Sequence, residues 1–405
     1  MTGTAIAKEA VAGQERLQLR AFVADDETRS VVEQVVGDLM IPAAAIHRGR
    51  IDDAIQLLGR QRSPRVLLVD ISACELPLSA VNELAEVCEP GVSVIAIGDR
   101  NDVGLFRELI NHGISDYLVK PLTPSLLQRS LLAVVEGGGQ HSRQTSRLGR
   151  IVAVMGCRGG VGATTVATSL AWAIASRRHR RVVLFDLDVQ FGSVALAMDL
   201  DPVHGLRDAL ENPGRIDGLY LDRTLVRHSE SLWVLSAEEA LDDPVRPDRD
   251  AVGLLLHELQ SKFHFTVVDL PRRMDPAVQQ VLQTATNFVL VSDLSLAGMR
   301  DGMRVVQLLQ ATNASCPVTV VANRVGEFRT GEIPKAEFER GLGRSIDLVL
   351  PFDPKHVFPL VNAGRPAASG SGATAAALCG LADQLCGAKS AGRGGLFAKL
   401  LARWS

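Results

Sequence analysis

The chain has 405 residues, of which 46% are hydrophobic and 22% charged, a composition typical of a soluble globular protein with room for two domains. Its formal net charge is −3 at pH 7, and this lack of an overall basic field argues against a general nucleic-acid binder. The 6 cysteines form no CxxC or metal-binding spacing, and the sequence has no apolar leader or run of about 18 apolar residues, so we expect reduced thiols and a cytoplasmic location.

Residues 1–18 show little pattern and are expected to form a flexible tail. From residue 19 to residue 136, strand signals alternate with helical signals. The strand signals are Leu19–Glu27, Arg65–Asp70, Val92–Asp99 and Asp116–Pro121, and the helical ones are Thr28–Leu39, Asp102–His112 and Pro124–Glu136. Such an alternation predicts an α/β domain built on a doubly wound parallel sheet.

Three of these strands end in residues that could form a site. Asp25 and Asp26 follow the first, Asp70 ends another, and Lys120 follows the last. Because the carboxyl ends of parallel strands meet at one edge of the sheet, we expect these side chains to lie together. The local sequences resemble a receiver domain with a flavodoxin-like fold. That resemblance implies that Asp25 and Asp26 hold Mg²⁺, that Asp70 accepts phosphate and that Lys120 neutralises it.

One position departs from the receiver pattern. The hydroxyl residue that a receiver carries after its fourth strand is replaced by Gly98, so a phosphate on Asp70 would lack its switching partner. Two interpretations therefore stay open. The domain is either a working phosphoacceptor or a degenerate receiver that serves for docking or dimerisation, and we favour the second.

Residues 137–149 are polar, glycine-rich and without periodicity, which predicts a flexible linker between two domains. A second domain is expected over residues 150–386. It begins with a buried strand, Ile151–Val154, which is followed by a glycine-dense turn over Gly156–Gly162. Thr164 and Thr165 then open an apolar helix. Successive backbone N–H groups of such a turn and the start of the helix together form a cradle for phosphate.

The cradle lacks one residue of the P-loop pattern. Ala163 occupies the place of the lysine, whose charge-assisted bond to phosphate would contribute about 1.5–3 kcal/mol. Thr164 keeps the hydroxyl that ligates Mg²⁺ in P-loops. Arg158 is a nearby cation that could reach phosphate, although its planar group differs from a lysine ammonium. We therefore expect ATP and Mg²⁺ to bind, with weak or absent hydrolysis.

Carboxylates at two later strand ends complete the predicted site. Arg181–Ser193 is a strand that ends in Asp186 and Asp188, and Phe265–Pro271 is a strand that ends in Asp269. An acid at a strand end beside the phosphate loop is the Walker B arrangement, which holds Mg²⁺. The arginines that follow, Arg272 and Arg273, either supplement the charge lost at Ala163 or are simply solvated.

The basic segment Ser176–Arg181 follows the helix of the phosphate loop. It could contact nucleic acid, or its cations could interact favourably with the negative end of the helix dipole. We favour the second interpretation because the segment contains no interleaved aromatic residues.

In its sequence order, this half of the chain resembles the MinD/ParA group of P-loop ATPases. The group's loop reads KGGxGKTT, and residues 158–165 read RGGVGATT. The resemblance implies nucleotide binding by Arg158, Gly159, Gly160, Val161, Gly162, Ala163, Thr164, Thr165, Asn323, Arg324, Pro351 and Asp353. It also implies that Thr164 and Asp269 hold the metal, that Asp188 and Asp269 are the catalytic residues, and that Asn323 reads the adenine edge. Residues 287–293 and 317–324 are expected to complete the parallel strands.

An RGGxGATT loop behind a receiver-like domain is similar to the TadZ/CpaE family of pilus-assembly proteins. That resemblance implies a nucleotide-dependent homodimer that marks where a Flp pilus or Tad secretion machine is assembled, often at a cell pole. Two alternatives remain, a ParA-like DNA-partitioning ATPase and a response regulator controlled by phosphorylation of Asp70. The negative net charge makes DNA binding the less favoured one.

The tail over residues 387–405 contains a short basic amphipathic segment. In a helix, five apolar residues would share one face, opposite Lys399 and Arg403: Leu396, Phe397, Leu400, Leu401 and Trp404. This pattern is typical of an interfacial helix at the inner membrane, or of a helix that docks on a partner or a second subunit. Both interpretations stay open.

Overall fold

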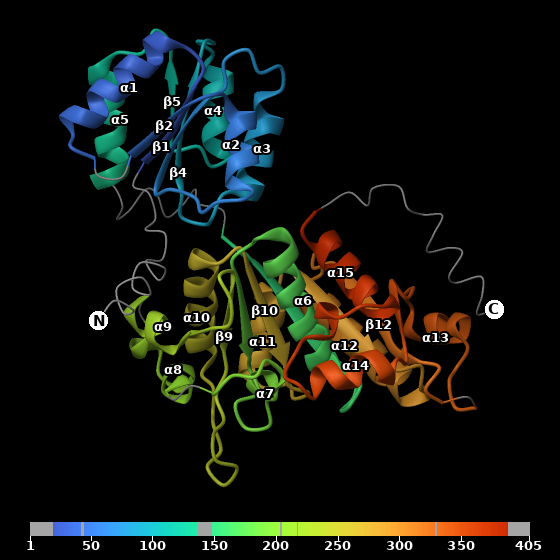
Figure 1. The fold of residues 1–405 in the computed structure, drawn as a ribbon. Coiled ribbons are helices and arrows are strands. Elements are labelled where there is room, and N and C mark those ends of the chain that lie inside the picture. Colours follow the sequence, from blue (N-terminus) through green and yellow to red (C-terminus); the bar gives the residue numbers. More distant parts are fainter. Residues whose placement is uncertain are drawn as a thin grey trace, which may run out of the picture. The chain divides into compact units, whose positions relative to one another are not determined.

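The computed structural model describes residues 19–41, 44–136, 148–202, 205–216, 218–328 and 330–387. Its contacts divide the chain into two compact units, residues 1–148 and 149–405, which are described separately below (Figure 1). The expected tail over residues 1–18 lies outside the described residues, as do all but residue 387 of the expected tail over 387–405 and most of the expected linker. In the part of the chain that is described, no helix is both long and apolar enough to cross a membrane.

The first unit is a five-stranded parallel sheet in the order β2-β1-β3-β4-β5, the doubly wound order of flavodoxin-like folds. Its strands are β1 (Leu19–Val23), β2 (Ala44–Arg48), β3 (Val66–Asp70), β4 (Ser93–Gly98) and β5 (Asp116–Val119). Its helices are α1 (Asp26–Asp38), α2 (Ile51–Leu58), α3 (Pro77–Val87), α4 (Val103–Asn111) and α5 (Pro124–Glu136). The predicted parallel α/β fold is confirmed, but the sequence analysis missed β2.

The helices of the first unit cover both faces of its sheet. Helices α1 and α5 pack on one face, and α2, α3 and α4 pack on the other (Figure 1). Every residue of β1, β3 and β4 is buried, which explains why these strands are apolar apart from Arg20, Asp70 and Ser93. Edge strand β2 is only half-buried, and its sequence AAIHR carries no such signal.

The second unit is an eight-stranded sheet in the order β13-β12-β11-β6-β10-β7-β9-β8. Its strands are β6 (Arg150–Gly156), β7 (Val182–Asp186), β8 (Val226–Arg227), β9 (Leu232–Leu235), β10 (Phe265–Leu270), β11 (Asn287–Ser292), β12 (Val318–Val325) and β13 (Leu348–Pro351). All neighbouring strands are parallel except β8 and β9. The expectation that β12 would complete the parallel strands was wrong, because β13 adds one more beyond it.

Helices also cover both faces of the second sheet. They are α6 (Ala163–Arg178), α7 (Val194–Ala197), α8 (Leu206–Glu211), α9 (Gly218–Thr224), α10 (Arg249–Lys262), α11 (Pro276–Thr284), α12 (Leu296–Thr312), α13 (Lys335–Leu342), α14 (Pro354–Val361) and α15 (Ala373–Leu385), with 3₁₀ turns η1 (Pro213–Arg215) and η2 (Ala367–Ser369). Helices α6 and α15 share one apolar layer, and α10, α11, α12 and α13 share the other (Figure 1).

Strand β6 lies in the interior of this sheet, between β10 and β11. The loop that leaves β6 therefore emerges at the middle of the carboxyl edge, where the ends of β10 and β7 supply acidic residues. Helix α6 follows this loop and is buried from Val166 to Ala175 almost without interruption. A loop fixed between a central strand and a buried helix has a rigid scaffold on both sides.

Candidate nucleotide-binding site

The loop between β6 and α6 depends on two glycines in the left-handed region. Gly160 has φ +79° and Gly162 has φ +87°, values that side-chain-bearing residues rarely adopt. A Cβ on Gly162 would lie 2.5 Å from the side-chain nitrogen of Asn323. Glycine is therefore required at position 162 both for the backbone angle and for the close approach of β12.

The phosphate-side pocket, a cavity of about 420 Å³, lies against this loop. It is lined by the seven consecutive residues from Arg158 to Thr164, which span the loop and the start of α6, and by Asp186, Asp188 and Asp269 at the ends of β7 and β10. The loop and the acids that the sequence analysis selected thus lie around one cavity. Ala163 is among the lining residues, so the position of the missing lysine faces this space.

A threonine hydroxyl and a carboxylate meet in the phosphate-side pocket. The hydroxyl of Thr164 donates a 2.6 Å hydrogen bond to Oδ2 of Asp269. Burial raises the pKa of Asp269 and outweighs the lowering by this hydrogen bond, and the charge of Asp188 raises it further. Burial and the charge of Asp269 also raise the pKa of Asp186. Burial and mutual repulsion thus both disfavour the charged forms of Asp186 and Asp269.

These oxygens fit a magnesium ion that also binds phosphate. Among the described residues, no three His, Cys, Asp or Glu side chains converge to hold a metal by themselves. Mg²⁺ usually keeps several waters and binds through one or two carboxylates together with substrate phosphates. Thr164 and Asp269 are hard oxygen donors of this kind, and a divalent cation would relieve the repulsion among the buried carboxylates.

The arginines around the pocket are all paired with carboxylates. Arg272 lies 2.6 Å from Asp301, and Arg273 lies 2.6 Å from Asp275. The sequence analysis had considered only solvation or replacement of the lost charge for these two arginines. Asp301 comes from the distant helix α12, so its pairing with Arg272 could not be recognised from the sequence. Arg273 also lies 3.7 Å from Oδ1 of Asp188, which lines the pocket.

Arg158 sits at the rim of the phosphate-side pocket. Its side chain is 44% exposed, and its Nη1 lies 3.6 Å from Oδ2 of Asp293, at the end of β11. Asp293 also accepts a 2.7 Å hydrogen bond from the hydroxyl of Ser295. At this distance and exposure the pair is weak, so Arg158 is free to exchange partners at little cost.

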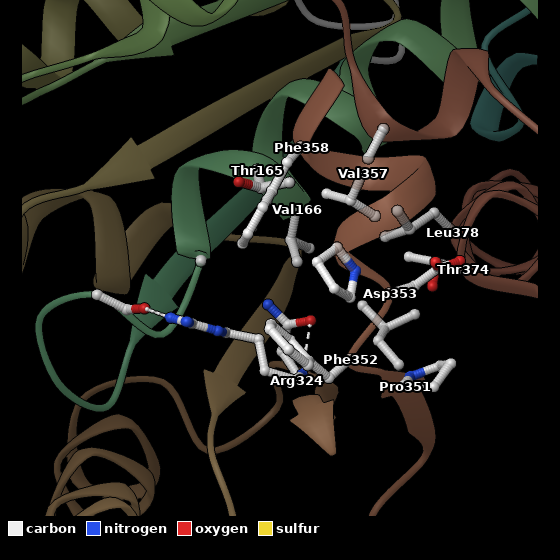
Figure 2. A pocket seen from close by; sticks show the side chains of 16 residues that line it. Thr165, Val166, Arg324, Pro351, Phe352, Asp353, Val357, Phe358, Thr374 and Leu378 are labelled. Carbon is white, nitrogen blue, oxygen red and sulfur yellow. Dashed lines mark hydrogen bonds between the residues drawn. The ribbon is translucent and has the colours of Figure 1, made fainter. Parts of the chain in front are cut away.

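A second, smaller cavity of about 200 Å³, the base-side pocket, also lies against the loop and shares Gly160 and Gly162 with the first (Figure 2). Its lining includes the predicted residues Thr165, Asn323, Arg324, Pro351 and Asp353. Apolar side chains, which the sequence analysis did not select, form much of the remainder: Val166, Leu350, Phe352, Val357, Phe358 and Leu378. The rings of Phe352 and Phe358 are 6.1 Å apart and nearly perpendicular. A flat apolar group would fit this lining.

Asn323 and Arg324 hold the loop from the side of β12. The side-chain nitrogen of Asn323 donates 2.8 Å to the carbonyl of Val161, and Nη1 of Arg324 donates 2.9 Å to the carbonyl of Gly160. The Asn323 oxygen accepts from the Arg324 N–H at 3.0 Å. The polar atoms of Asn323 are thus bonded to protein, and its amide does not extend freely into the base-side pocket.

Asp353 has a structural role in the described state. Its carboxylate accepts a 2.8 Å hydrogen bond from His356 and caps the start of α14. Pro351 ends β13 and is exposed. The sequence analysis grouped these two residues with the nucleotide site, and the structure places both in the wall of the base-side pocket.

Comparison with known proteins gives this unit a family. Residues 152–357 match the CobQ/CobB/MinD/ParA nucleotide binding domain family. The chain belongs to this family. The predicted MinD-like P-loop domain is thereby confirmed.

Individual members of the family and related structures show more distant likenesses. The septum site-determining protein MinD of Bacillus subtilis is 25% identical over 228 residues, which are 55% of this chain and 82% of that protein. The Pyrococcus horikoshii MinD structure, complexed with Mg-ADP, is 22% identical with a TM-score of 0.51 and covers 59% of this chain and 96% of its own. It shows a shared fold. The pilus assembly protein CpaE of Caulobacter crescentus is 32% identical over 29% of this chain and 93% of its own, with a TM-score of 0.28.

The basic segment Ser176–Arg181, expected to follow α6, begins inside it, because α6 extends to Arg178, and the segment is held by partners inside the MinD/ParA domain. Arg178 pairs with Asp383 at 2.8 Å, and Arg177 lies 4.0 Å from the same carboxylate. Arg181 packs over the rings of Trp233 and Phe263 at 5.0 and 5.1 Å. The aromatic partners that the sequence analysis did not find within the segment come from β9 and from the end of α10.

The first unit, outside the MinD/ParA domain, brings three of its four predicted residues together. Nζ of Lys120 lies 2.6 Å from both Asp25 and Asp70. Asp70 is fully buried, and it also accepts hydrogen bonds from the N–H groups of Ala24 and Ser72 at 3.0 and 2.9 Å. The carboxylate of Asp70 is thus satisfied by the protein itself.

The ion pairs of Lys120 shift the pKa values of both acids. Burial alone would raise the pKa of Asp25, but hydrogen bonds from Lys120 and Thr28 outweigh it and bring the pKa to about 2. Burial alone would also raise the pKa of Asp70, but the hydrogen bonds from Lys120, Ser72 and Ala24 outweigh burial and lower this pKa. Asp26 does not join the group. Its side chain is 77% exposed and lies 3.8 Å from Arg48.

Gly98 has a packing reason that its sequence position did not reveal. A Cβ at this position would lie 2.4 Å from the hydroxyl oxygen of Tyr117 and 2.8 Å from a ring carbon. Tyr117 is buried, and its hydroxyl donates 2.9 Å to the carbonyl of Arg100. The tyrosine therefore fills the space into which a residue with a hydroxyl side chain would project.

Proposed function

We propose that the MinD/ParA domain binds ATP with Mg²⁺ and hydrolyses it slowly or not at all. The observation that carries this proposal is the combination of a retained Thr164–Asp269 pair with Ala163 in place of the P-loop lysine. The phosphate-side and base-side pockets share Gly160 and Gly162, which supports one ligand reaching from a base to its phosphates.

Each residue has a proposed part in binding. The backbone N–H groups of the loop bind the phosphates, and Thr164 and Asp269 hold the metal. When bound, Mg²⁺ would neutralise charge that develops on the phosphates. Asp188 orients a water for attack on the outer phosphate. Because Ala163 carries no charge, the loop binds phosphate through its backbone N–H groups alone. It lacks the charge-assisted hydrogen bond that a lysine ammonium would donate to phosphate.

The test is calorimetric titration of the full chain with Mg·ADP and Mg·ATP, beside a steady-state hydrolysis assay. We expect saturable binding that weakens in Thr164→Ala and Asp269→Asn, and turnover below about one per second, the low end of ordinary enzymes. Absence of binding to the wild type would refute the proposal. Faster turnover would refute its second half.

We further infer that nucleotide-bound copies pair as a homodimer that marks the assembly site of a Flp pilus or Tad secretion machine. The support is the resemblance of the RGGVGATT loop, in its place behind the first unit, to the TadZ/CpaE family. Sedimentation with and without ATP tests the homodimer. A fluorescent fusion tests the location, which we expect to be a focus at a cell pole that Thr164→Ala disperses. Uniform fluorescence in wild-type cells would contradict it.

The first unit is proposed as a degenerate receiver that docks partners without phosphorylation. The engagement of Asp70 by Lys120 and two N–H groups supports this, as does the packing of Tyr117 against Gly98. Incubation with acetyl phosphate and mass spectrometry is the test. Stoichiometric labelling of Asp70 would favour the response-regulator alternative, and salt-sensitive retention on DNA would favour the ParA-like one. The proposed membrane contact over residues 396–404 lies outside the described residues.

A further inference from the structure

The carboxyl end of β12 is irregular beside the nucleotide site. Ala322 pairs with Val349 of β13, but Val325 pairs with Pro351, so β12 has one residue more than β13 in this interval. Arg324, within the bulge, has φ +60°, in the left-handed region. Bulges re-aim side chains, and a non-glycine residue in this conformation persists only when its surroundings compensate for the strain.

The bulge directs two side chains at the outer side of the phosphate loop. Asn323 donates to the carbonyl of Val161 at 2.8 Å, and Arg324 donates to the carbonyl of Gly160 at 2.9 Å. The guanidinium of Arg324 is itself fixed by Glu327 and packs 5.8 Å from the centroid of Phe352 (Figure 2). Two consecutive loop carbonyls are therefore held by side chains from the end of β12.

Holding a carbonyl also sets the direction of the next N–H group. In a trans peptide the C=O and the N–H of the same plane point in opposite directions. Fixing the carbonyl of Gly160 thus turns the N–H of Val161 away from β12, and fixing the carbonyl of Val161 does the same for Gly162. Both residues line the phosphate-side pocket.

We propose that Arg324, together with Asn323, is a positioning residue that preorganises the phosphate loop. Two loop N–H groups are kept in place for phosphate before the ligand arrives, in a loop whose Ala163 provides no charged anchor. This role rests on the proposed nucleotide binding. It differs from contact with the base, because Arg324 acts on the loop through the Gly160 carbonyl.

The expected effect follows from the cost of ordering a loop. If a substitution at Arg324 frees the backbone of one loop residue, nucleotide binding must order that residue again. This would weaken phosphate binding about five- to thirtyfold. Adenosine has no phosphates and should bind equally well with an ordered or a disordered loop. The difference between Mg·ADP and adenosine therefore separates a positioning role from a part in the base-side pocket.

The experiment measures Mg·ADP affinity by calorimetry and adenosine affinity by competition, in the full chain. The variants are Arg324→Ala, Arg324→Lys and Asn323→Ala, and the control is Arg340→Ala, an exposed arginine on α13. We expect Arg324→Ala to lose about five- to thirtyfold for Mg·ADP and less than about twofold for adenosine. Lysine should restore part of the loss, since it can donate to Gly160 but cannot also hold Glu327. Equal losses for both ligands, or no loss for Mg·ADP, would overturn the proposal.

A second measurement keeps the proposal testable without nucleotide. In the free protein, amide order parameters of Val161 and Gly162 should fall from about 0.85 to below about 0.6 in Arg324→Ala. Unchanged values would refute the positioning role, even if nucleotide binds. If the wild type binds no nucleotide and the order parameters still fall in Arg324→Ala, the proposed nucleotide binding is refuted. The proposal that Arg324 positions the loop is then still supported. Asn323→Ala should lower the order parameters of the same amides, and this variant replaces Arg324→Ala in the test if Arg324→Ala does not fold.

Discussion

The hydroxyl of Thr164 donates a 2.6 Å hydrogen bond to the carboxylate of Asp269, and the residue just before Thr164 is an alanine. The groups suited to a metal are thus present in the phosphate-side pocket, while the charged anchor for phosphate is missing. Ala163 is among the residues that line the same pocket.

Replacing Ala163 by lysine should strengthen nucleotide binding. A lysine ammonium that reaches phosphate contributes about 1.5–3 kcal/mol, so the dissociation constant for Mg·ADP should fall about ten- to a hundredfold. Calorimetric titration measures it. Ala163→Met is the matched control, because methionine fills similar space without a charge. If methionine tightens binding as much as lysine, or if neither does, the loop does not bind phosphate in the proposed way.

Adding a side chain at Gly98 should destabilise the first unit. The Cβ would lie 2.4 Å from the Tyr117 hydroxyl, and overpacking of this kind costs about 1–3 kcal/mol. In Tyr117→Leu the same Gly98→Ala change should cost much less, because the ring that it strikes is absent. A double-mutant cycle of unfolding free energies measures the coupling. Additive effects would show that Tyr117 is not the reason for glycine at this position.

The ion pairs of Lys120 should make the stability of the first unit depend on pH. Asp25, with its pKa at about 2, and Asp70, whose pKa is also lowered, titrate below the unfolded value near 4. Their contribution is therefore fully present above about pH 4 and is lost as the pH falls toward 2. Calorimetric melting of the full chain between pH 7 and pH 2 measures it.

Lys120→Met should change the sign of this dependence. The variant leaves the buried Asp70 carboxylate without its cation, a loss of about 3–5 kcal/mol at pH 7. In the variant the pKa of Asp70 lies above its unfolded value, so lowering the pH protonates Asp70. The loss of stability relative to the wild type then becomes smaller. Arg129→Met, on the exposed face of α5, is the control. A loss that grows toward acidic pH would contradict the assignment.

Strong local patterns made much of this fold predictable. Buried strands such as β6 and β10 are continuous apolar runs, and the glycine loop between β6 and α6 has a spacing found in phosphate sites. Strands β2 and β13 were missed because they lie at sheet edges, are short and are only partly buried. A half-buried edge strand has no strong apolar signal of its own.

The sequence predicted which residues surround the site better than it predicted their partners. Asn323 and Arg324 line the base-side pocket, but their bonds to loop carbonyls depend on a bulge that no sequence pattern announces. Likewise, Tyr117 explains Gly98 only once β4 and β5 are paired. Such contacts come from packing between segments that are distant in sequence, which local propensities do not encode.

The final prediction concerns Arg158, which we infer to reach the nucleotide of a second subunit in the proposed dimer, as the resemblance of its loop to the MinD/ParA group implies. Here Arg158 is 44% exposed at the pocket rim and pairs weakly with Asp293 at 3.6 Å. A guanidinium can make two parallel bonds to phosphate, so the proposed dimer should keep this link. Two links, each about 1.5–3 kcal/mol, would make association depend on bound nucleotide.

Arg158→Ala should therefore spare the Mg·ATP affinity of the monomer and abolish ATP-dependent dimerisation. Asp293→Asn should strengthen ATP-dependent dimerisation, because Arg158 then loses no ion pair with Asp293 when it binds the nucleotide of the partner subunit. Sedimentation velocity at saturating ATP, run beside a binding titration, measures both, with Arg340→Ala as the control. If Arg158→Ala instead destroys monomer affinity, the arginine serves its own subunit's phosphates in place of the missing lysine. Dimerisation equal to that of the wild type would exclude the link between subunits.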